Sequence, residues 1–508
     1  MEHTKKHDVL VKNALILAIG GFAAKAIGAI YRIPLTNLLG GEGMGIYQTV
    51  FPLYCMILTL SSTGIPAGLS RLIAAKNEED GRRLFLVAIR LMALIGLLGS
   101  ILMAVFGGLI AKAQGAPLAR KSYLALAPSV LIVSLVSCYR GYAQGKLKML
   151  PTALSQLIEQ VFKLAFGLLF STLFLPDISR AAAGAVLGVT LSELVALGYL
   201  ALRFRVTEPK MKIPVLSFRS DAKQIALTVV PVVLSSLLIP LSHVIDSFMI
   251  VNLLSRHTGD ATTLYGLFTG AVNSLVNLPV ALAYGVAAAI IPVLSVRAAR
   301  GDDGAVQKQT SLAVGLTIFI AIPFALYFIV LGGDAVDVLY GGLEEVERQT
   351  VVGLLRVSSL SVVFLSLTQT LSSALVGQGK PYVPVVTLAV GVVVKTIASA
   401  ITLQMPTLGI YGAAISTNLC YLVAGMGNLV YSIKGGKTAL RLMGWVIVGF
   451  TAGGIAVGVA SALRLGGVQG ALIRTATAGS ITVLSAAIAF FLFQKKSRKR
   501  FVKKVDEL

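Results

Sequence analysis

FAAKAIGAIYRIPLTNLLGGEGMGIYQTVFPLYCMILTLSSTGIPAGLSRLIAAKNEEDGRR, residues Phe22–Arg83, consists of two apolar spans joined by a glycine-rich corner. The first span carries Lys25 and Arg32 inside an otherwise apolar run. On a helix these two cations share one stripe with Gly21 and Gly28, because residues three and four apart lie on the same face. Charged residues inside a membrane usually mark a pathway. The stripe therefore predicts a cavity wall, and snorkelling of the two cationic side chains to the interface is the alternative.

Composition identifies a polytopic membrane protein. Hydrophobic residues make up 56% of the 508 residues and charged residues only 13%, about half the charged share of an ordinary soluble domain. The net charge of +22 does not indicate a nucleic-acid partner, because the lysines and arginines lie between apolar spans. The three cysteines lie inside apolar spans without metal-ligand spacing, so neither disulfides nor a metal site are expected.

Fourteen apolar runs, each about 20 residues or longer, are predicted to be transmembrane helices. Most of the 44 Lys and Arg residues fall in alternate connecting segments, which also include both ends of the chain. The positive-inside rule then predicts a multi-pass protein of the cell membrane with both termini in the cytoplasm. The predicted spans are 10–34, 43–70, 83–111, 118–142, 149–174, 181–203, 222–251, 262–294, 307–331, 350–377, 382–404, 409–433, 439–463 and 470–493.

An internal repeat organises these spans. The segment Ile65–Arg71, IPAGLSR, recurs as Ile291–Arg297, IPVLSVR, and the AQGK corner at Ala143 recurs as GQGK at Gly377. Six predicted helices separate the copies, so both copies enter the membrane in the same sense. A parallel repeat of this kind places a substrate site between the two halves near mid-membrane.

The predicted fold is therefore all-α, with two pseudo-symmetric six-helix bundles and two additional helices. The expected domains are an N-terminal bundle at 1–205, a C-terminal bundle at 206–435, and two extra helices with a basic cytoplasmic tail at 436–508. No nucleotide-binding loop, metalloprotease pattern or catalytic triad is present in the sequence. We expect no catalytic residue, metal or cofactor, and hence no enzyme.

Ionisable residues within the spans are the candidate site residues. In the fifth span Glu159 and Lys163 are one helical turn apart and able to pair. Glu159 and Asp246 are the candidates for ion coupling, and a structural ion pair or ordinary interhelical hydrogen bonding is the alternative. Lys163 and Lys395 follow matching QGK corners at nearly equal depth, about 17–18 Å along their helices. Since Glu159 would neutralise Lys163, Lys395→Gln is expected to impair function more than Lys163→Gln.

The motifs RIPLTNLLGGEGMGIYQTVFPLY and STGIPAGLSRLIA and the QGK corners resemble the polysaccharide-transport branch of the MOP superfamily, which includes stage V sporulation B proteins and lipid II flippases. The resemblance covers nearly the whole chain. It implies fourteen helices, two bundles around a central cavity, alternating access, and transfer of undecaprenyl-pyrophosphate-linked sugars. It also implies that the last two helices form a groove for the lipid tail. Lys25 stands at a position where Gram-negative flippases carry an arginine.

The expected function is a flippase for lipid II or a related cell-wall glycolipid. A cation-coupled multidrug exporter and a non-transporting scaffold for cell-wall or spore-cortex assembly are the alternatives. The expected partners are a lipid-linked oligosaccharide, membrane lipids, a coupling cation and cell-wall synthesis proteins, without nucleic acid. The inner basic patch, formed by Arg71, Arg82 and Arg83 at the inner mouth, would attract anionic head groups. The expected substrate-binding residues are Lys25, Arg32, Lys163, Lys395, Arg71, Arg82 and Arg83.

Overall fold

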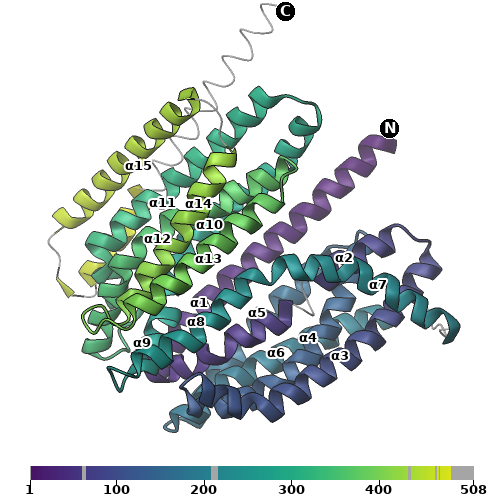
Figure 1. Ribbon diagram of the computed structural model, residues 1–508, viewed down its shortest axis with the longest axis horizontal. Helices are drawn as coiled ribbons and strands as arrows, with labels where there is room; N and C mark the ends of the chain where they lie inside the picture. Colours follow the sequence, from purple (N-terminus) through teal and green to yellow (C-terminus); the bar gives the residue numbers. More distant parts are fainter. Residues whose placement is uncertain are drawn as a thin grey trace, which may run out of the picture. The chain divides into compact units, whose positions relative to one another are not determined.

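The computed structural model describes residues 2–59, 64–207, 215–432, 436–463, 466–467 and 469–481. Within these ranges the regular elements are helices (Figure 1). The chain folds as two compact units. Unit 1 comprises Met1–Ser274 and Thr396–Ala413, and unit 2 comprises Leu275–Lys395 and Ala414–Leu508.

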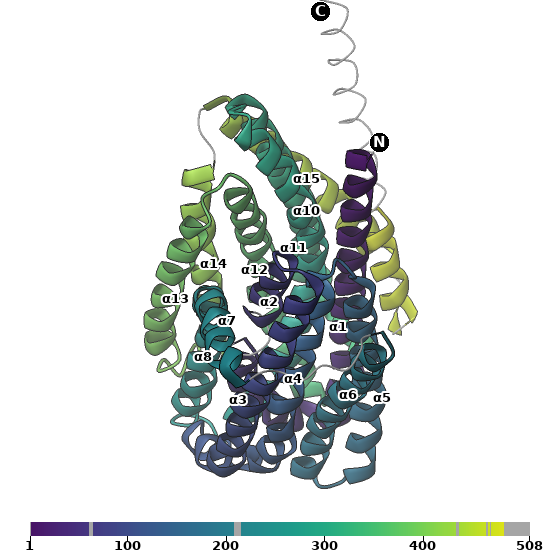
Figure 2. The same ribbon diagram turned by 90° about the vertical axis from the view of Figure 1, so that its right-hand side faces the viewer.

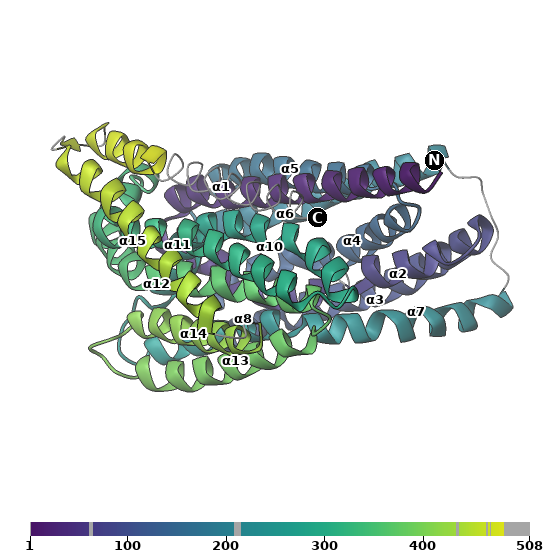
Figure 3. The ribbon, with the colours of Figure 1, turned by 90° about the horizontal axis from the view of Figure 1, so that it is seen from above.

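Unit 1 contains the helices of the N-terminal half of the chain, up to Ser274. Its elements are α1 (Glu2–Leu58), α2 (Gly64–Ala74), α3 (Glu78–Ala113), η2 (Pro117–Ala119), α4 (Arg120–Gly145), α5 (Leu150–Phe174), α6 (Ile178–Thr207), α7 (Val215–Ser236), α8 (Leu238–Leu254), α9 (Ala261–Gly266) and the π-helical turn η3 (Leu267–Val272). In unit 1, α5 packs along α6 and α3 along α4 (Figure 2). Helix α1 packs along α5, as seen from above in Figure 3.

Unit 2 contains the later helices, and α10, α13 and α14 include residues of both units. Its elements are α10 (Asn273–Ala299), α11 (Asp303–Leu339), α12 (Glu345–Gly377), α13 (Tyr382–Thr402), α14 (Tyr411–Ser432), α15 (Gly436–Ala462) and a helical segment at 469–481. Helix α11 packs against both α12 and α15, and Val314, Ile318 and Leu371 form part of that core.

Local sequence explains where several helices begin. Asn77 caps α3 by accepting a hydrogen bond from the Asp80 backbone N–H at 2.8 Å. Asp302 caps α11 in the same way, accepting from the Ala305 N–H at 2.9 Å. Each cap satisfies a backbone donor that the first helical turn leaves unpaired. The dipeptides Asp80-Gly81 and Asp303-Gly304 lie in the first turns of α3 and α11.

The predicted first and second spans differ from the helices observed. They are joined in α1, and the glycine-rich corner between them contains a kink at Gly40, which has φ 63° and ψ −175°. Glycine adopts this backbone conformation without the steric penalty of a Cβ atom. The predicted span 43–70 is divided between the end of α1 and α2, with residues 60–63 outside the described residues.

The predicted seventh span also differs, because 222–251 is divided between α7 and α8 at Leu237. Pro240 explains the break, since a proline ring clashes with the carbonyl four residues earlier and removes a backbone donor. That carbonyl belongs to Ser236, the last residue of α7. The predicted eighth span corresponds to α9, η3 and α10 in succession.

The protein is an all-α, multi-pass membrane protein. Within the described residues, ten helices are long and apolar enough to cross a bilayer. With only 17 residues, α8 is shorter than the spans counted. The expected count of fourteen spans and the expected bounds 1–205, 206–435 and 436–508 stay predictions.

Candidate functional site

The contact between α1 and α5 in unit 1 depends on small residues. A Cβ atom placed on Gly20 would lie 2.6 Å from the Ala153 Cβ, and one on Gly28 would lie 2.8 Å from the Gln160 Oε1. A Cβ on Gly167 of α5 would lie 2.2 Å from the Tyr31 hydroxyl. The glycine stripe of α1 therefore faces α5. These glycines allow the two helices to approach closely, and the prediction that the stripe lines a cavity wall stays a prediction.

Lys163 lies on α5 beside two aromatic rings of α1. Its Nζ is 5.3 Å from the ring centroid of Phe51 and 5.7 Å from that of Tyr31. Aromatic faces attract cations at such distances. Among the described residues no carboxylate lies within ion-pair distance of Lys163, which is half-buried. The lysine is thus a cation held in an apolar helix by rings and without a counter-charge in contact.

Glu159 pairs with a residue of the neighbouring helix α4. Its carboxylate lies 2.8 Å from the Arg140 guanidinium, which also donates to the Ser155 hydroxyl at 3.0 Å. The expected pairing of Glu159 with Lys163 is therefore wrong. An arginine fork can serve a carboxylate and a hydroxyl together, which a single ammonium on the same helix does less well.

Glu193 lies at the centre of α6 and is 3% exposed. The Tyr54 hydroxyl of α1 donates to its Oε1, and the Ser129 hydroxyl of α4 contacts its Oε2. Ser129 and Tyr54 also contact each other, with 3.0 Å between their oxygens. Sequence reasoning missed this residue, although it is the only acidic residue of the predicted span 181–203. An ionisable residue inside a span is itself a signal of function.

These side chains form an embedded polar cluster, which we define as Glu159, Lys163 and Glu193. They are close enough that Glu193 interacts electrostatically with both Glu159 and Lys163. The cluster lies within unit 1 on α5 and α6. With Glu159 neutralised by Arg140, Lys163 is the member able to hold an anion.

Five of the remaining predicted cations belong to unit 1. On α1, Arg32 is half-buried, and the side chain of Lys25 lies outside the described part of the structure. Arg71 of α2 is exposed. Arg82 is 6% exposed, with its guanidinium 5.7 Å from the Phe204 ring centroid.

Arg83 is engaged in two ion pairs. It lies 2.9 Å from Asp221 of α7 and 3.1 Å from Asp80 of its own helix. Of the expected inner basic patch, Arg71 is thus the exposed member, while Arg82 and Arg83 contact other side chains.

Two further predicted residues lie apart from the cluster. Lys395 belongs to unit 2 and is 6% exposed. Asp246 lies 4.0 Å from His243 on α8, and the histidine is the more exposed of the two. Across the residues that the structure describes, no group of three or more His, Cys, Asp or Glu is placed to hold a metal ion.

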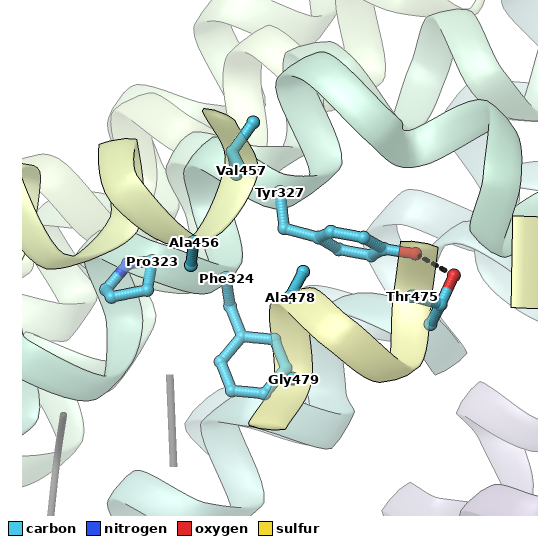
Figure 4. Close-up of a pocket in the computed structure, with 8 residues that line it drawn as sticks. All are labelled: Pro323, Phe324, Tyr327, Ala456, Val457, Thr475, Ala478 and Gly479. Carbon is cyan, nitrogen blue, oxygen red and sulfur yellow. Dashed lines mark hydrogen bonds between the residues drawn. The ribbon is translucent and has the colours of Figure 1, made fainter. Parts of the chain in front are cut away.

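Unit 2 contains an apolar pocket of about 110 Å³ between α11, α15 and the segment 469–481. Pro323 and Phe324 form one side, and Ala456 and Gly479 lie near them (Figure 4). At its edge Tyr327 and Thr475 share a hydrogen bond of 2.7 Å. The lining chemistry suits a hydrocarbon chain.

The segment 469–481, which forms part of the pocket, is also joined to α11 by an ion pair. Arg474 of the segment 469–481 makes two hydrogen bonds of 2.7 Å to the Asp334 carboxylate. Such a two-point contact fixes orientation as well as distance.

Comparisons with known proteins give both a family and a fold. The family model described as "Polysaccharide biosynthesis protein" matches residues 10–296, and a model described as "MatE" matches 231–401. The Bacillus subtilis (strain 168) "Stage V sporulation protein B" is 26% identical, with 91% of this chain and 92% of that protein covered. The "Lipid II flippase MurJ" of the same organism is 23% identical, with 87% of each chain covered.

A solved structure agrees with this fold. The "Lipid II flippase MurJ, inward closed conformation" matches with a TM-score of 0.73 and 16% identity, covering 94% of this chain and 99% of that one. At this identity the match establishes the fold alone.

Proposed function

Because the chain belongs to the polysaccharide biosynthesis protein family of MOP transporters, we propose that it is a flippase for an undecaprenyl-pyrophosphate-linked cell-wall saccharide. The cargo would be lipid II or a related glycolipid, moved across the cytoplasmic membrane by alternating access. As a transporter, it is not an enzyme.

The observation that carries this proposal is the state of Lys163. A cation with no carboxylate in contact, inside an apolar helix of the described unit 1, is costly unless it serves an anion. A pyrophosphate supplies several acceptor oxygens and would form charge-assisted hydrogen bonds with the ammonium. The rings of Phe51 and Tyr31 would hold the lysine in place while no anion is bound. Lys25, Arg32 and Lys395 are the further candidates for anion binding.

The pocket of unit 2 supports the lipid half of the cargo. Its walls are apolar, and burying a methylene in such a pocket contributes about 0.8 kcal/mol. We propose that it holds part of the polyprenyl tail. Arg71, the exposed cation of the inner basic patch, would attract the anionic head group from the cytoplasmic leaflet.

The proposal includes the architecture expected from the repeat. It comprises fourteen spans in two six-helix bundles with two extra helices, and both termini in the cytoplasm. Asp246 and Glu159 remain the candidates for ion coupling, with Glu159 acting through its pair with Arg140. Cell-wall synthesis proteins are the expected protein partners.

A cation-coupled multidrug exporter is the second candidate, because the MatE model also matches part of the chain. Such an exporter needs an acidic site for cationic drugs, whereas Lys163 presents a cation. Reconstituted vesicles separate the candidates. A flippase moves fluorescent lipid II between leaflets, an exporter expels ethidium, and a scaffold does neither. Ethidium export without lipid movement would overturn the proposal.

A further inference from the structure

Three side-chain oxygens from three helices form a closed ring in unit 1. They belong to Tyr54 of α1, Ser129 of α4 and Glu193 of α6, and each residue contacts the other two. Their exposed fractions are 4%, 0% and 3% respectively, so solvent has almost no access to the ring. The ring therefore has to satisfy its own hydrogen bonds.

Counting protons decides which form of Glu193 fits the ring. Three hydrogen bonds need three protons, and the hydroxyls of Tyr54 and Ser129 supply one each. With an ionised carboxylate, one of the three contacts would join two oxygens with no proton between them. With a protonated carboxyl, Ser129 donates to Tyr54, Tyr54 donates to Glu193 Oε1, and the Glu193 O–H donates to Ser129. Each contact then has one donor and one acceptor.

Burial favours the same form. An ionised carboxylate removed from water is costly unless a cation or several donors compensate it. In the described part of the chain, no Lys, Arg or His lies within ion-pair distance of Glu193. A buried carboxyl in this situation takes up a proton instead of remaining charged.

Within the described part of the chain, the titratable neighbours of Glu193 come from two helices. From α1 they are Tyr54 and Cys55, and from α5 they are Glu159 and Lys163, while α4 contributes the Ser129 hydroxyl. The Glu159 charge opposes ionisation of Glu193 and the Lys163 charge favours it, because like charges repel and opposite charges attract. Since Glu159 already pairs with Arg140, Lys163 is the neighbour whose charge an ionised Glu193 would compensate.

We infer that Glu193 is a membrane-embedded proton-binding site, closed by Tyr54 and Ser129, whose proton is linked to anion binding at Lys163. While Glu193 is protonated, Lys163 is available to a phosphate-type anion. Once the proton leaves, the negative charge of the Glu193 carboxylate compensates the positive charge of Lys163 and weakens its attraction for the anion. The linkage is reciprocal, so anion binding also strengthens proton binding. The linkage to anion binding at Lys163 rests on the proposed function, whereas the proton-binding site at Glu193 does not.

Infrared spectroscopy of the reconstituted full chain tests the proton site. At neutral pH we expect the carbonyl stretch of a protonated carboxyl, absent in Glu193→Gln and retained in the control Glu345→Gln, which removes an exposed carboxylate of unit 2. The glutamine variant should fold, because its amide donates to Ser129 and accepts from Tyr54 as the protonated acid does. Absence of the band from the unmodified protein, or its persistence in Glu193→Gln, would overturn the assignment.

Tyr54→Phe provides a second variant that keeps the carboxyl. Loss of the Tyr54 hydroxyl removes the hydrogen-bond donor to the Glu193 carbonyl oxygen, so the infrared band should remain and move to higher frequency. A band unchanged in position would show that the carboxyl lies outside this ring.

The linkage is tested with a water-soluble dialkyl pyrophosphate, whose charge is constant near neutral pH. Its affinity should fall by about tenfold as the infrared band disappears on raising the pH, and it should not fall in Glu193→Gln. An affinity independent of pH in the unmodified protein would overturn the linkage. Absence of binding at every pH would contradict the proposed anion site, and the infrared result would still decide the proton site.

Discussion

The Glu159 carboxylate lies 2.8 Å from the Arg140 guanidinium of the neighbouring helix. The i, i+4 spacing on α5 had indicated Lys163 as the partner of Glu159, but the carboxylate pairs with Arg140 instead. The reason for expecting Lys395 to matter more than Lys163 is thereby removed, since Lys163 is not neutralised by Glu159. Both lysines become primary targets for substitution.

Lys163→Gln should reduce lipid transport in reconstituted vesicles by about 10–100-fold. A hydrogen bond to a charged group contributes about 1.5–3 kcal/mol, which corresponds to that range. Thermal stability should change little, because Lys163 has no ion pair among the described residues. Lys163→Arg, which keeps the charge and the contact with the rings, is the matched control and should retain most of the activity. Equal rates for Lys163→Gln and the unmodified protein would exclude an anion-binding role.

Gly266→Ala should destabilise unit 1. A Cβ atom there would lie 2.2 Å from the Gly41 backbone oxygen and 2.3 Å from the Gly45 nitrogen. Overpacking of this kind costs about 1–3 kcal/mol. The control is Gly198→Ala in α6, where no atom of the described part of the chain lies within 4 Å of the added Cβ and the substitution should be neutral or stabilising. Thermal unfolding of the two variants checks this, and equal midpoints would show that α1 and α9 can separate without cost.

Composition and hydrophobic runs were sufficient to predict an all-α membrane protein, because apolar length is a property of a single segment. Contacts between helices were harder to predict. Glu159 and Lys163 are four residues apart on one helix, a spacing that allows an ion pair. In the structure, however, Arg140 of α4 pairs with the Glu159 carboxylate. Likewise the ring around Glu193 joins residues 54, 129 and 193, and no local spacing connects them. The glycines of α1 were recognised as a stripe, but not as a contact face for α5.

Asp177 should make the stability of the connection before α6 depend on pH. It accepts a hydrogen bond from the Arg180 N–H at 2.9 Å and pairs with Lys121 at 3.3 Å. The backbone hydrogen bond, followed by the contacts with Lys121 and Arg180, lowers the pKa of this carboxyl below its usual value. Its stabilising effect is full above the unfolded-state pKa of about 3.9. The effect is lost as the pH falls through the lower folded-state pKa.

Asp177→Asn keeps an oxygen for the Arg180 N–H and removes the charge, so it isolates the ionic part. The unmodified protein should unfold at a higher temperature than this variant at neutral pH. The difference should shrink in acid, and a difference that stays constant down to the acid range would contradict the assignment.

Gly479→Leu should partly fill the apolar pocket of unit 2 and select against long lipid tails. Gly479 lines the pocket beside Phe324, and among the described residues no atom lies within 4 Å of the position its Cβ would take. If the leucine excludes about two methylenes of the tail, at about 0.8 kcal/mol each, transport of a long-chain lipid should fall about tenfold.

A short-chain analogue that does not reach the pocket should move at the unmodified rate. Gly454→Ala on α15 is the control and should affect neither lipid, because Gly454 does not line the pocket and its added Cβ would meet no atom of the described residues within 4 Å. Rates for both chain lengths, measured in the same vesicles, check the prediction. An equal loss for long and short chains would mean that the substitution acts on folding and not on the tail.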